Sequence, residues 1–203
     1  MSLTGIILAA GESRRMGTPK ALLELDGETF LDRLILTLGG TCSPVIVVLG
    51  SEAQKIRAGL RSADQATFVN NAEYQRGQLS SLQCGLAAVP AEADGVMFTL
   101  VDHPGVLPST VARIARRFHE RAPQESLVIP CCGRQRGHPV CVARELIPEF
   151  LALPSDAQAR DVIHRHREHA VYMDVEDNGI LDDVDDPETY QRLTGRAPLP
   201  EGE

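Results

Sequence analysis

TGIILAAGESRRMGTPK, residues 4–20, joins an apolar run to a loop of small and basic residues. The run from Thr4 to Ala10 has no charged residue, which is typical of a strand in a sheet covered on both faces. The loop after it contains glycines, a serine, two arginines and a lysine. Small residues let a ligand approach the backbone, and exposed N–H groups with basic side chains bind phosphate oxygens. The segment therefore predicts a buried strand that ends at a phosphate-binding loop.

The spacing within this loop differs from that of two familiar phosphate-binding motifs. Gly11, Gly17 and Lys20 do not have the Walker spacing, and neither serine nor threonine follows the lysine. G-x-G-x-x-G is absent as well. The chain contains only two lysines, Lys20 and Lys55, so a lysine in this loop is notable. A solvated surface turn is the alternative interpretation, and we favour phosphate binding.

Apolar runs alternate with segments of helical periodicity through the first 130 residues. Strands are expected at residues 4–10, 44–49, 66–70, 95–101 and 127–130, and helices at 29–38, 52–60, 79–89 and 108–121. The alternation predicts right-handed βαβ units and a mainly parallel sheet, in a three-layer α/β/α sandwich. Farther along we expect a strand at 136–142, helices at 144–153 and 157–169, a strand at 170–175, and a helix capped by Asp186.

Length, composition and charge exclude several classes of protein. With 203 residues, 43% of them hydrophobic, the chain is expected to form a single domain over residues 1–194, with a frayed tail at 195–203. The net charge of −8 comes from residues 171–203, which contain ten acidic and two basic residues. The remaining acidic and basic residues balance, so we expect no surface for nucleic acid or for a membrane.

The cysteines and the N-terminus predict the compartment. The chain has five cysteines and no C-x-x-C, so each is expected to be a small buried residue with a free thiol. No basic segment precedes the first apolar run, so a signal peptide is not expected. We therefore expect a cytoplasmic protein.

Further blocks follow L-A-A-G-x-S-x-R-M-G-x-x-K in the order found in one enzyme family. They are N-A-E-Y at 71–74, G-Q-L-S-S-L at 77–82 with G-L at 85–86, L-V-D-H-P at 100–104, G-H-P-V at 137–140 and D-V-D-D-P-E at 183–188. Together they resemble the motifs of the molybdenum cofactor cytidylyltransferases, nucleotidyltransferases with a glycosyltransferase-A-like Rossmann fold. The resemblance implies a sheet like that of the nucleotide-diphospho-sugar transferases. This chain departs from the family at Ala72, His103, Asp186 and residues 155–160.

The resemblance implies an enzyme that transfers CMP from CTP to the phosphate of molybdopterin or molybdenum cofactor, releases pyrophosphate, and uses Mg²⁺ or Mn²⁺. Asp102 follows an apolar strand, at the edge where α/β sheets bind ligands, and is the expected metal ligand. Asp183 and Asp185 alternate on an expected extended segment, so either is a candidate for the second carboxylate. Arg14 and Lys20 are expected to hold the triphosphate and the departing pyrophosphate.

Small and neutral polar residues are expected around the nucleotide: Leu8, Ala9, Ala10, Gly11, Ser13, Asn71, Ser80 and Ser81. His138, in a basic loop, is expected either to contact an anionic acceptor or to bond the backbone. His164, His166 and His169 are expected to form a solvated face rather than a metal site, because neighbouring positions on a helix point apart.

Three alternatives stay open from the sequence. The same site would serve another phosphorylated acceptor, or would use GTP, or the fold would be a non-catalytic carrier of molybdenum cofactor. In the family, CTP users tend to have L-A-A-G where GTP users have L-A-G-G, so Ala9-Ala10 favours CTP. A molybdoenzyme or an insertion chaperone is the expected recipient of the product.

Overall fold

The computed structural model describes residues 2–196, which are arranged around one large sheet. Its strands are β1 (Leu3–Ala9), β4 (Val45–Leu49), β5 (Thr67–Asn70), β6 (Gly95–Leu100), β7 (Leu127–Cys132), β8 (Gln135–Arg136), β9 (Val140–Ala143) and β10 (Ala170–Asp174). The order is β10-β7-β9-β6-β1-β4-β5, and β8 pairs with β7. The central strands β1, β4 and β6 are parallel, whereas β9 runs antiparallel to β6 and β7. The prediction of a mainly parallel sheet is confirmed.

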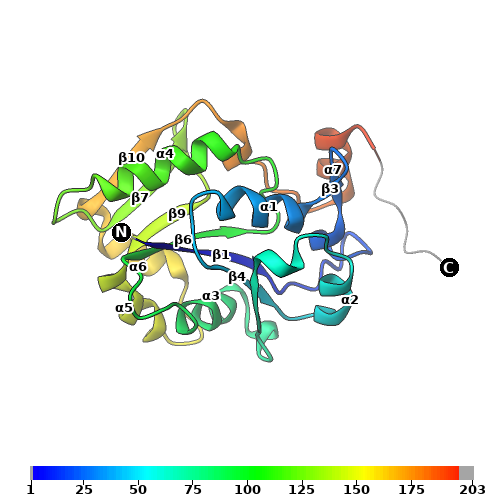
Figure 1. Ribbon diagram of the computed structural model, residues 1–203, viewed down its shortest axis with the longest axis horizontal. Coiled ribbons are helices and arrows are strands. Elements are labelled where there is room, and N and C mark those ends of the chain that lie inside the picture. Colours follow the sequence, from blue (N-terminus) through cyan, green and yellow to red (C-terminus); the bar gives the residue numbers. More distant parts are fainter. Residues whose placement is uncertain (1, 197–203) are drawn as a thin grey trace.

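Two helical layers cover the sheet (Figure 1). One contains α1 (Phe30–Gly39) and α4 (Pro108–His119), and the other contains α3 (Gln78–Ala87), α5 (Ile147–Leu151) and α6 (Ala159–Arg165). Side chains of β1 point alternately to the two faces of the sheet, so they contribute to two hydrophobic clusters. Leu3 and Ile7 pack in one cluster, and Ile6 and Leu8 pack in the other. These continuous apolar strands are buried on both faces, as a three-layer sandwich requires.

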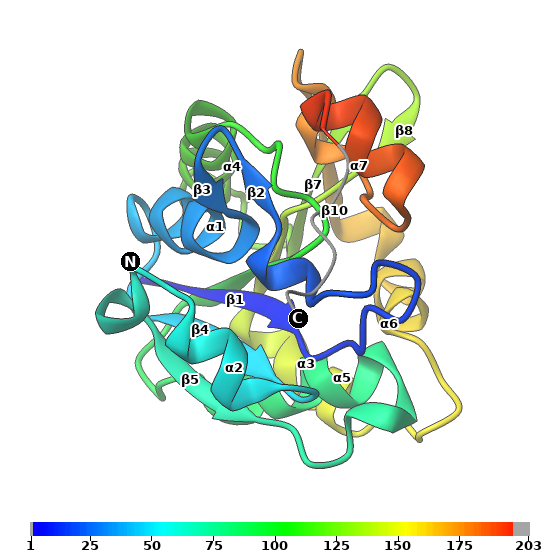
Figure 2. The ribbon, with the colours of Figure 1, turned by 90° about the vertical axis from the view of Figure 1, so that its right-hand side faces the viewer.

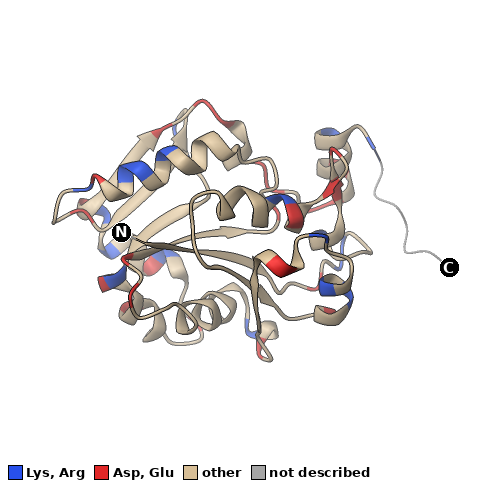
Figure 3. Cartoon of the chain, in the orientation of Figure 1, with Lys and Arg blue, Asp and Glu red and all other residues tan. Residues whose placement is uncertain are grey.

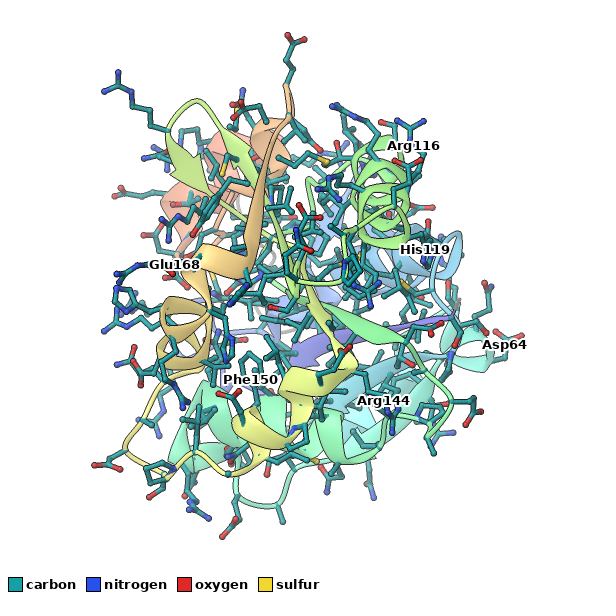
Figure 4. All side chains as sticks on the ribbon, turned by 90° about the vertical axis from the view of Figure 1, so that its left-hand side faces the viewer. Asp64, Arg116, His119, Arg144, Phe150 and Glu168 are labelled. Atoms are coloured by element: carbon teal, nitrogen blue, oxygen red, sulfur yellow. The ribbon has the colours of Figure 1, made fainter. Side chains whose placement is uncertain are left out.

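Two short helices lie beside the edge of the sheet at which β1 ends. They are α2 (Ala53–Ala58) and α7 (Pro187–Thr194), both on the right of Figure 1. The predicted cap of α7 is confirmed, because Asp186 Oδ1 accepts a hydrogen bond from Thr189 N at 2.8 Å. Figure 4 shows the opposite end of the sheet, with Arg144, Glu168 and the buried Phe150 labelled.

Three local predictions were wrong in detail. The strand expected at 136–142 is divided into β8 and β9, because Pro139 has no N–H for the ladder. The helix expected at 157–169 ends at Arg165 and is followed by a separate 3-10 turn. The helix expected at 144–153 starts as a 3-10 turn before α5.

A hairpin of β2 (Glu24–Leu25) and β3 (Glu28–Thr29) was not predicted. Its turn places Asp26 at φ 54° and Gly27 at φ 85°, the left-handed region that an Asp-Gly pair favours. In the view of Figure 3, basic and acidic segments are interspersed over both helical layers.

Each of the five cysteines has a free thiol, as the sequence predicts. Cys42, Cys131 and Cys141 are buried, but the prediction of burial was wrong for Cys84 and Cys132, which are partly exposed. Among residues 2–196 no helix combines the length and apolar character needed to span a bilayer. Of the predicted frayed tail, residues 197–203 lie outside the described residues.

Candidate active site

The parallel strands β1, β4 and β6 end at the same edge of the sheet, where a cavity of about 400 Å³ opens. Figure 2 looks onto this edge and shows the loop after β1. Ten of the residues predicted for the site line the cavity: Leu8, Ala9, Ala10, Gly11, Ser13, Arg14, Lys20, Ser81, Asp102 and Asp185. Residues from four separate parts of the chain therefore line the same cavity.

The loop at residues 10–20 is held in a closed turn by its own contacts. Ser13, at φ 50°, accepts a hydrogen bond at its carbonyl oxygen from Met16 N at 2.8 Å. Its hydroxyl oxygen accepts another from Lys20 N at 2.9 Å. Met16 is buried in the core and anchors the middle of the loop. These contacts fix the direction in which Lys20 leaves the loop.

Asp102 lies just beyond β6 and meets two carboxylates from near the end of the chain. Oxygen atoms of Asp102, Asp183 and Asp185 all lie within 4.8 Å of one another. The backbone joins the two segments as well, because Val184 N donates to the Asp102 carbonyl oxygen at 3.0 Å. Since positions i and i+2 of an extended segment face the same side, both candidates for the second carboxylate reach Asp102.

The chemistry of this three-carboxylate cluster fits a divalent cation. Asp102 Oδ1 is buried and has no hydrogen-bond partner among the described residues. Carboxylate oxygens are the ligands that Mg²⁺ and Mn²⁺ prefer. Burial, with the charges of Asp102 and Asp185, raises the pKa of Asp183 to about 6. A bound cation would relieve this mutual repulsion.

Lys20 provides a positive charge to the same carboxylates. Its Nζ lies 2.6 Å from Asp185 Oδ1 and 3.2 Å from Asp102 Oδ2, and its side chain is only 12% exposed. Burial alone would lower the pKa of Lys20, but the hydrogen bond to Asp185 and the charge of Asp102 outweigh it and raise the pKa. The ammonium is therefore charged and aimed at the cavity.

Arg14 and Arg15 line the cavity beside Lys20. The Arg14 side chain is largely exposed and forms an ion pair with Glu12. An exposed pair of this kind is weak and exchanges readily for a phosphate. Arg14 is therefore free to reorient toward an anionic ligand.

Asn71 and Ser80 lie behind the cavity rather than on its surface. Asn71, which is buried, donates from Nδ2 to Ser80 Oγ at 2.9 Å and to Ser81 Oγ at 3.1 Å. Asn71 thus orients Ser81, which lines the cavity. Tyr74 and Gln78 also line it, although we did not select them from the sequence. Both lie in blocks that carry the family resemblance, so those blocks were the sequence feature from which they could have been predicted as site residues.

His138 is not among the residues that line the cavity. Its ring lies 5.1 Å from that of His103 and 5.7 Å from that of Phe98, and its Nδ1 is buried with no hydrogen-bond partner within residues 2–196. Burial, with the charge of His103, lowers the pKa of His138 to about 4. A neutral imidazole packed in this way offers no positive charge to an anionic acceptor.

The histidines of α6 and the following turn do not gather around a metal position. His166 Nε2 lies 2.8 Å from Glu149 Oε1, and His164 is exposed. Over residues 2–196, the aspartates of the three-carboxylate cluster are the one group arranged to hold an ion.

Residues 5–170 match the family described as the MobA-like NTP transferase domain. The chain belongs to this family. The family resemblance read from the sequence is thereby confirmed, as is the mixed α/β fold. The chain is a MobA-like nucleotidyltransferase, and enzymes of this family use divalent metal ions.

Named relatives cover nearly the whole chain. The Nicotine blue oxidoreductase of Paenarthrobacter nicotinovorans is 33% identical over 198 residues, which cover 94% of this chain and 96% of that protein. The Molybdenum cofactor cytidylyltransferase of Escherichia coli K12 is 25% identical over 185 residues, which cover 91% and 92%.

Solved structures agree in fold with this MobA-like nucleotidyltransferase. Rv0371c from Mycobacterium tuberculosis H37Rv superimposes with a TM-score of 0.80 at 29% identity, covering 97% of this chain and 100% of that chain. A structure of Rv0371c in complex with manganese gives a TM-score of 0.76 at 27% identity, with the same coverage.

Proposed function

We propose that this MobA-like nucleotidyltransferase transfers CMP from CTP to the phosphate of molybdopterin, or of molybdenum-loaded molybdopterin, and releases pyrophosphate. The observation that carries the proposal is the convergence of Lys20 with the three-carboxylate cluster at one edge of the cavity. Nucleotidyl transfer needs this combination, because it depends on positioning and charge neutralisation rather than on a covalent partner.

In this reaction an oxygen of the acceptor phosphate attacks the α-phosphorus of CTP. The bond from that phosphorus to the bridging oxygen breaks, and pyrophosphate leaves with the electron pair. Lys20 and Arg14 bind the triphosphate and stabilise the charge that grows on the leaving group. Asp102, Asp183 and Asp185 would hold Mg²⁺ or Mn²⁺, which neutralises phosphate charge when bound.

The proposal of CTP as the donor is supported by the small residues at the end of β1. Ala10 is only 5% exposed and lines the cavity, so its methyl group occupies space beside the strand. A pyrimidine tolerates this loss of space better than a purine does, because packed sites do not dilate freely. Among named relatives, the Escherichia coli cytidylyltransferase spans most of the chain.

We further propose that the product passes to a molybdoenzyme or an insertion chaperone. A cofactor joined to a nucleotide is a group carrier rather than an end product, so a protein that accepts it is required. We also retain the interpretation of residues 1–194 as one domain, because strands from both ends of this range belong to one sheet.

The decisive experiment is a pyrophosphate-release assay with each of the four NTPs, with and without molybdopterin, in Mg²⁺ or Mn²⁺. We expect release only when CTP and molybdopterin are both present, and its loss in Asp102→Asn. Equal release with GTP would contradict the choice of nucleotide, and absence of release with every NTP would contradict nucleotidyl transfer.

The similarity to a Nicotine blue oxidoreductase makes a redox activity the second candidate function. It is tested on the same preparation by following oxidation of NADH or NADPH with nicotine blue as the acceptor. We expect no oxidation above the rate without protein, because a lysine among three carboxylates suits phosphate and a divalent cation. Oxidation that persists in Asp102→Asn would favour the redox candidate.

A further inference from the structure

Asp183 and Asp185 belong to a segment, residues 177–185, that lies outside the sheet. It follows β10 and contains one 3-10 turn, Asn178–Ile180. No strand ladder fixes its position relative to Asp102. The placement of two metal-ligand candidates therefore depends on a few contacts made by the 177–185 segment itself.

The first of these contacts is made by a buried carboxylate. Asp177 is 5% exposed, and its Oδ2 accepts a hydrogen bond from Leu107 N at 3.0 Å. Its Oδ1 accepts another from Gly179 N at 2.9 Å. Leu107 belongs to the loop that runs from Asp102 to α4. One carboxylate therefore joins the two segments from which the three-carboxylate cluster is built.

Glycines allow the two segments to touch at the backbone. A Cβ at Gly179 would overlap the carbonyl oxygen of Gly105, and a Cβ at Gly137 would overlap that of Ile180. His138 N also donates to the Ile180 carbonyl oxygen at 3.0 Å. The 177–185 segment is thus seated on two loops, with no room for a side chain between them.

The far end of the segment is fixed at Asp102 itself. Val184 is fully buried, and its N–H donates to the Asp102 carbonyl oxygen at 3.0 Å. With Val184 facing the core, the alternation of an extended chain turns its two aspartate neighbours the other way, toward the carboxylate of Asp102.

We propose that Asp177 is a positioning residue for the three-carboxylate cluster, because it holds the 177–185 segment on the loop after β6. Asp177 lies outside the cavity lining and acts through the backbone of Leu107 and Gly179. The inference rests on the proposed function for the role of the cluster, and adds a residue that determines how well the cluster binds its cation. Partners one step removed from a metal control its affinity by orienting the ligands.

A purely structural role is the alternative, and the chain contains a matched control for it. Asp32 is 3% exposed and accepts hydrogen bonds from Arg61 N at 3.0 Å and Ser62 N at 2.8 Å. Like Asp177, it is a buried aspartate that accepts hydrogen bonds from two backbone N–H groups, here both from residues 61 and 62. Replacing Asp32 should lower stability without displacing the cluster.

The test measures Mn²⁺ binding by the electron paramagnetic resonance signal of free Mn²⁺, with and without CTP, together with Tm. The variants are Asp177→Asn and the control Asp32→Asn. At position 177 asparagine keeps the size of the side chain but sets an amide NH₂ against one of the two N–H donors, which bond different oxygens. At position 32 both backbone donors bond Oδ1, so asparagine keeps an acceptor for them and removes the negative charge that strengthens the two hydrogen bonds. We expect the Mn²⁺ Kd to rise about 10- to 100-fold in Asp177→Asn. In Asp32→Asn we expect a lower Tm with the wild-type Kd.

A second variant tests the same contact by different chemistry. Gly179→Ala keeps Asp177 but inserts a methyl group against the Gly105 carbonyl oxygen, so its Kd for Mn²⁺ should also rise. It serves as the reporter if Asp177→Asn does not fold. A wild-type Kd in soluble Asp177→Asn would overturn the positioning role, as would a wild-type Kd in Gly179→Ala where Asp177→Asn does not fold, or an equal rise in Asp32→Asn.

The outcomes separate this inference from the proposed function. If wild type binds Mn²⁺, Asp177→Asn weakens that binding, and no NTP yields pyrophosphate, the positioning role stands and the proposed function fails. If wild type releases pyrophosphate and Asp177→Asn retains its Mn²⁺ Kd, the proposed function stands and the positioning role fails. Absence of Mn²⁺ binding by wild type, with and without CTP, would overturn the positioning role.

Discussion

Lys20 Nζ lies 2.6 Å from Asp185 Oδ1, an ion pair between residues 165 positions apart in the sequence. It joins the loop after β1 to the segment that precedes α7. A divalent cation at the three-carboxylate cluster would be attracted to the same oxygens as the ammonium. When a triphosphate is bound as well, its phosphates become the natural partners of Lys20.

Replacing Lys20 should therefore change cation and nucleotide binding in opposite directions. In Lys20→Ala we expect tighter Mn²⁺ binding without nucleotide, weaker CTP binding, and turnover reduced about 10²- to 10³-fold. Lys20→Arg should rescue turnover poorly, because a planar fork does not reproduce a compact ammonium. Calorimetric titration and the pyrophosphate assay measure these effects.

Lys55→Ala is the matched control for Lys20, since Lys55 is the other lysine and lies on α2. It should behave as wild type in each assay. Full activity of Lys20→Arg would show that only the charge at position 20 matters.

Asp102→Asn should reduce turnover on the order of a thousandfold and leave the fold intact. The change removes one carboxylate from the cluster, and losing metal stabilisation of several kcal/mol accounts for a factor of this size. Turnover is measured by pyrophosphate release at saturating Mg²⁺, and the fold by circular dichroism and Tm. Near-normal activity that still depends on Mg²⁺ would show that Asp102 is not a ligand.

Ala10→Gly should narrow the preference for CTP over GTP. We expect wild type to favour CTP by roughly tenfold to a few hundredfold in kcat/KM, in the range that steric discrimination supplies. Removing the methyl group opens space beside β1 for a purine. Both nucleotides are compared on wild type and variant. An unchanged ratio would place base selection elsewhere, for example at Ser81.

His138 should make the stability of the fold depend on pH. Its pKa falls from 6.5 to about 4 in the folded protein, so the unfolded chain binds the proton more tightly. The stabilisation is fully present above the unfolded pKa of 6.5 and is lost as the pH falls toward 4. Between about pH 7 and pH 5, this costs about 2 kcal/mol.

The measurement for His138 is urea unfolding of wild type and His138→Gln across this pH range. The difference between the two free energies of unfolding separates the contribution of His138 from that of neighbouring His103, whose pKa burial also lowers. The difference should shrink as the pH falls. A difference that stays constant with pH for His138→Gln would contradict the assigned pKa.

The sequence predicted the strands of the sheet well because burial on both faces leaves a continuous apolar run. It also located Asp102 and Lys20, since both lie where a strand or its loop ends. The β2–β3 hairpin was missed although Asp26-Gly27 is a strong turn signal, because its strands are only two residues each. Asn71 orients Ser81 through a side-chain hydrogen bond between residues ten positions apart. Hydrophobic periodicity in the sequence does not predict such a bond.

The choice between Asp183 and Asp185 illustrates the same limit. Alternation showed that both would face one side, but the hydrogen bond from Val184 to Asp102 decides what that side faces. Such a bond joins loops more than 80 residues apart and leaves no local pattern. His138 is a second case, since it precedes β9 and is buried against Phe98 on β6 and His103 in the loop after β6.

Because Val184 and Asp185 belong to the candidate site, its residues are synthesised at widely separated times during translation. Lys20 leaves the ribosome early, and Asp185, one of its two carboxylate partners, follows 165 residues later. A nascent chain that ends before residue 183 contains every strand of the sheet but only one of the three clustered aspartates. Such a chain would contain Lys20 and Asp102 but lack Asp183 and Asp185, two of the three carboxylates of the cluster.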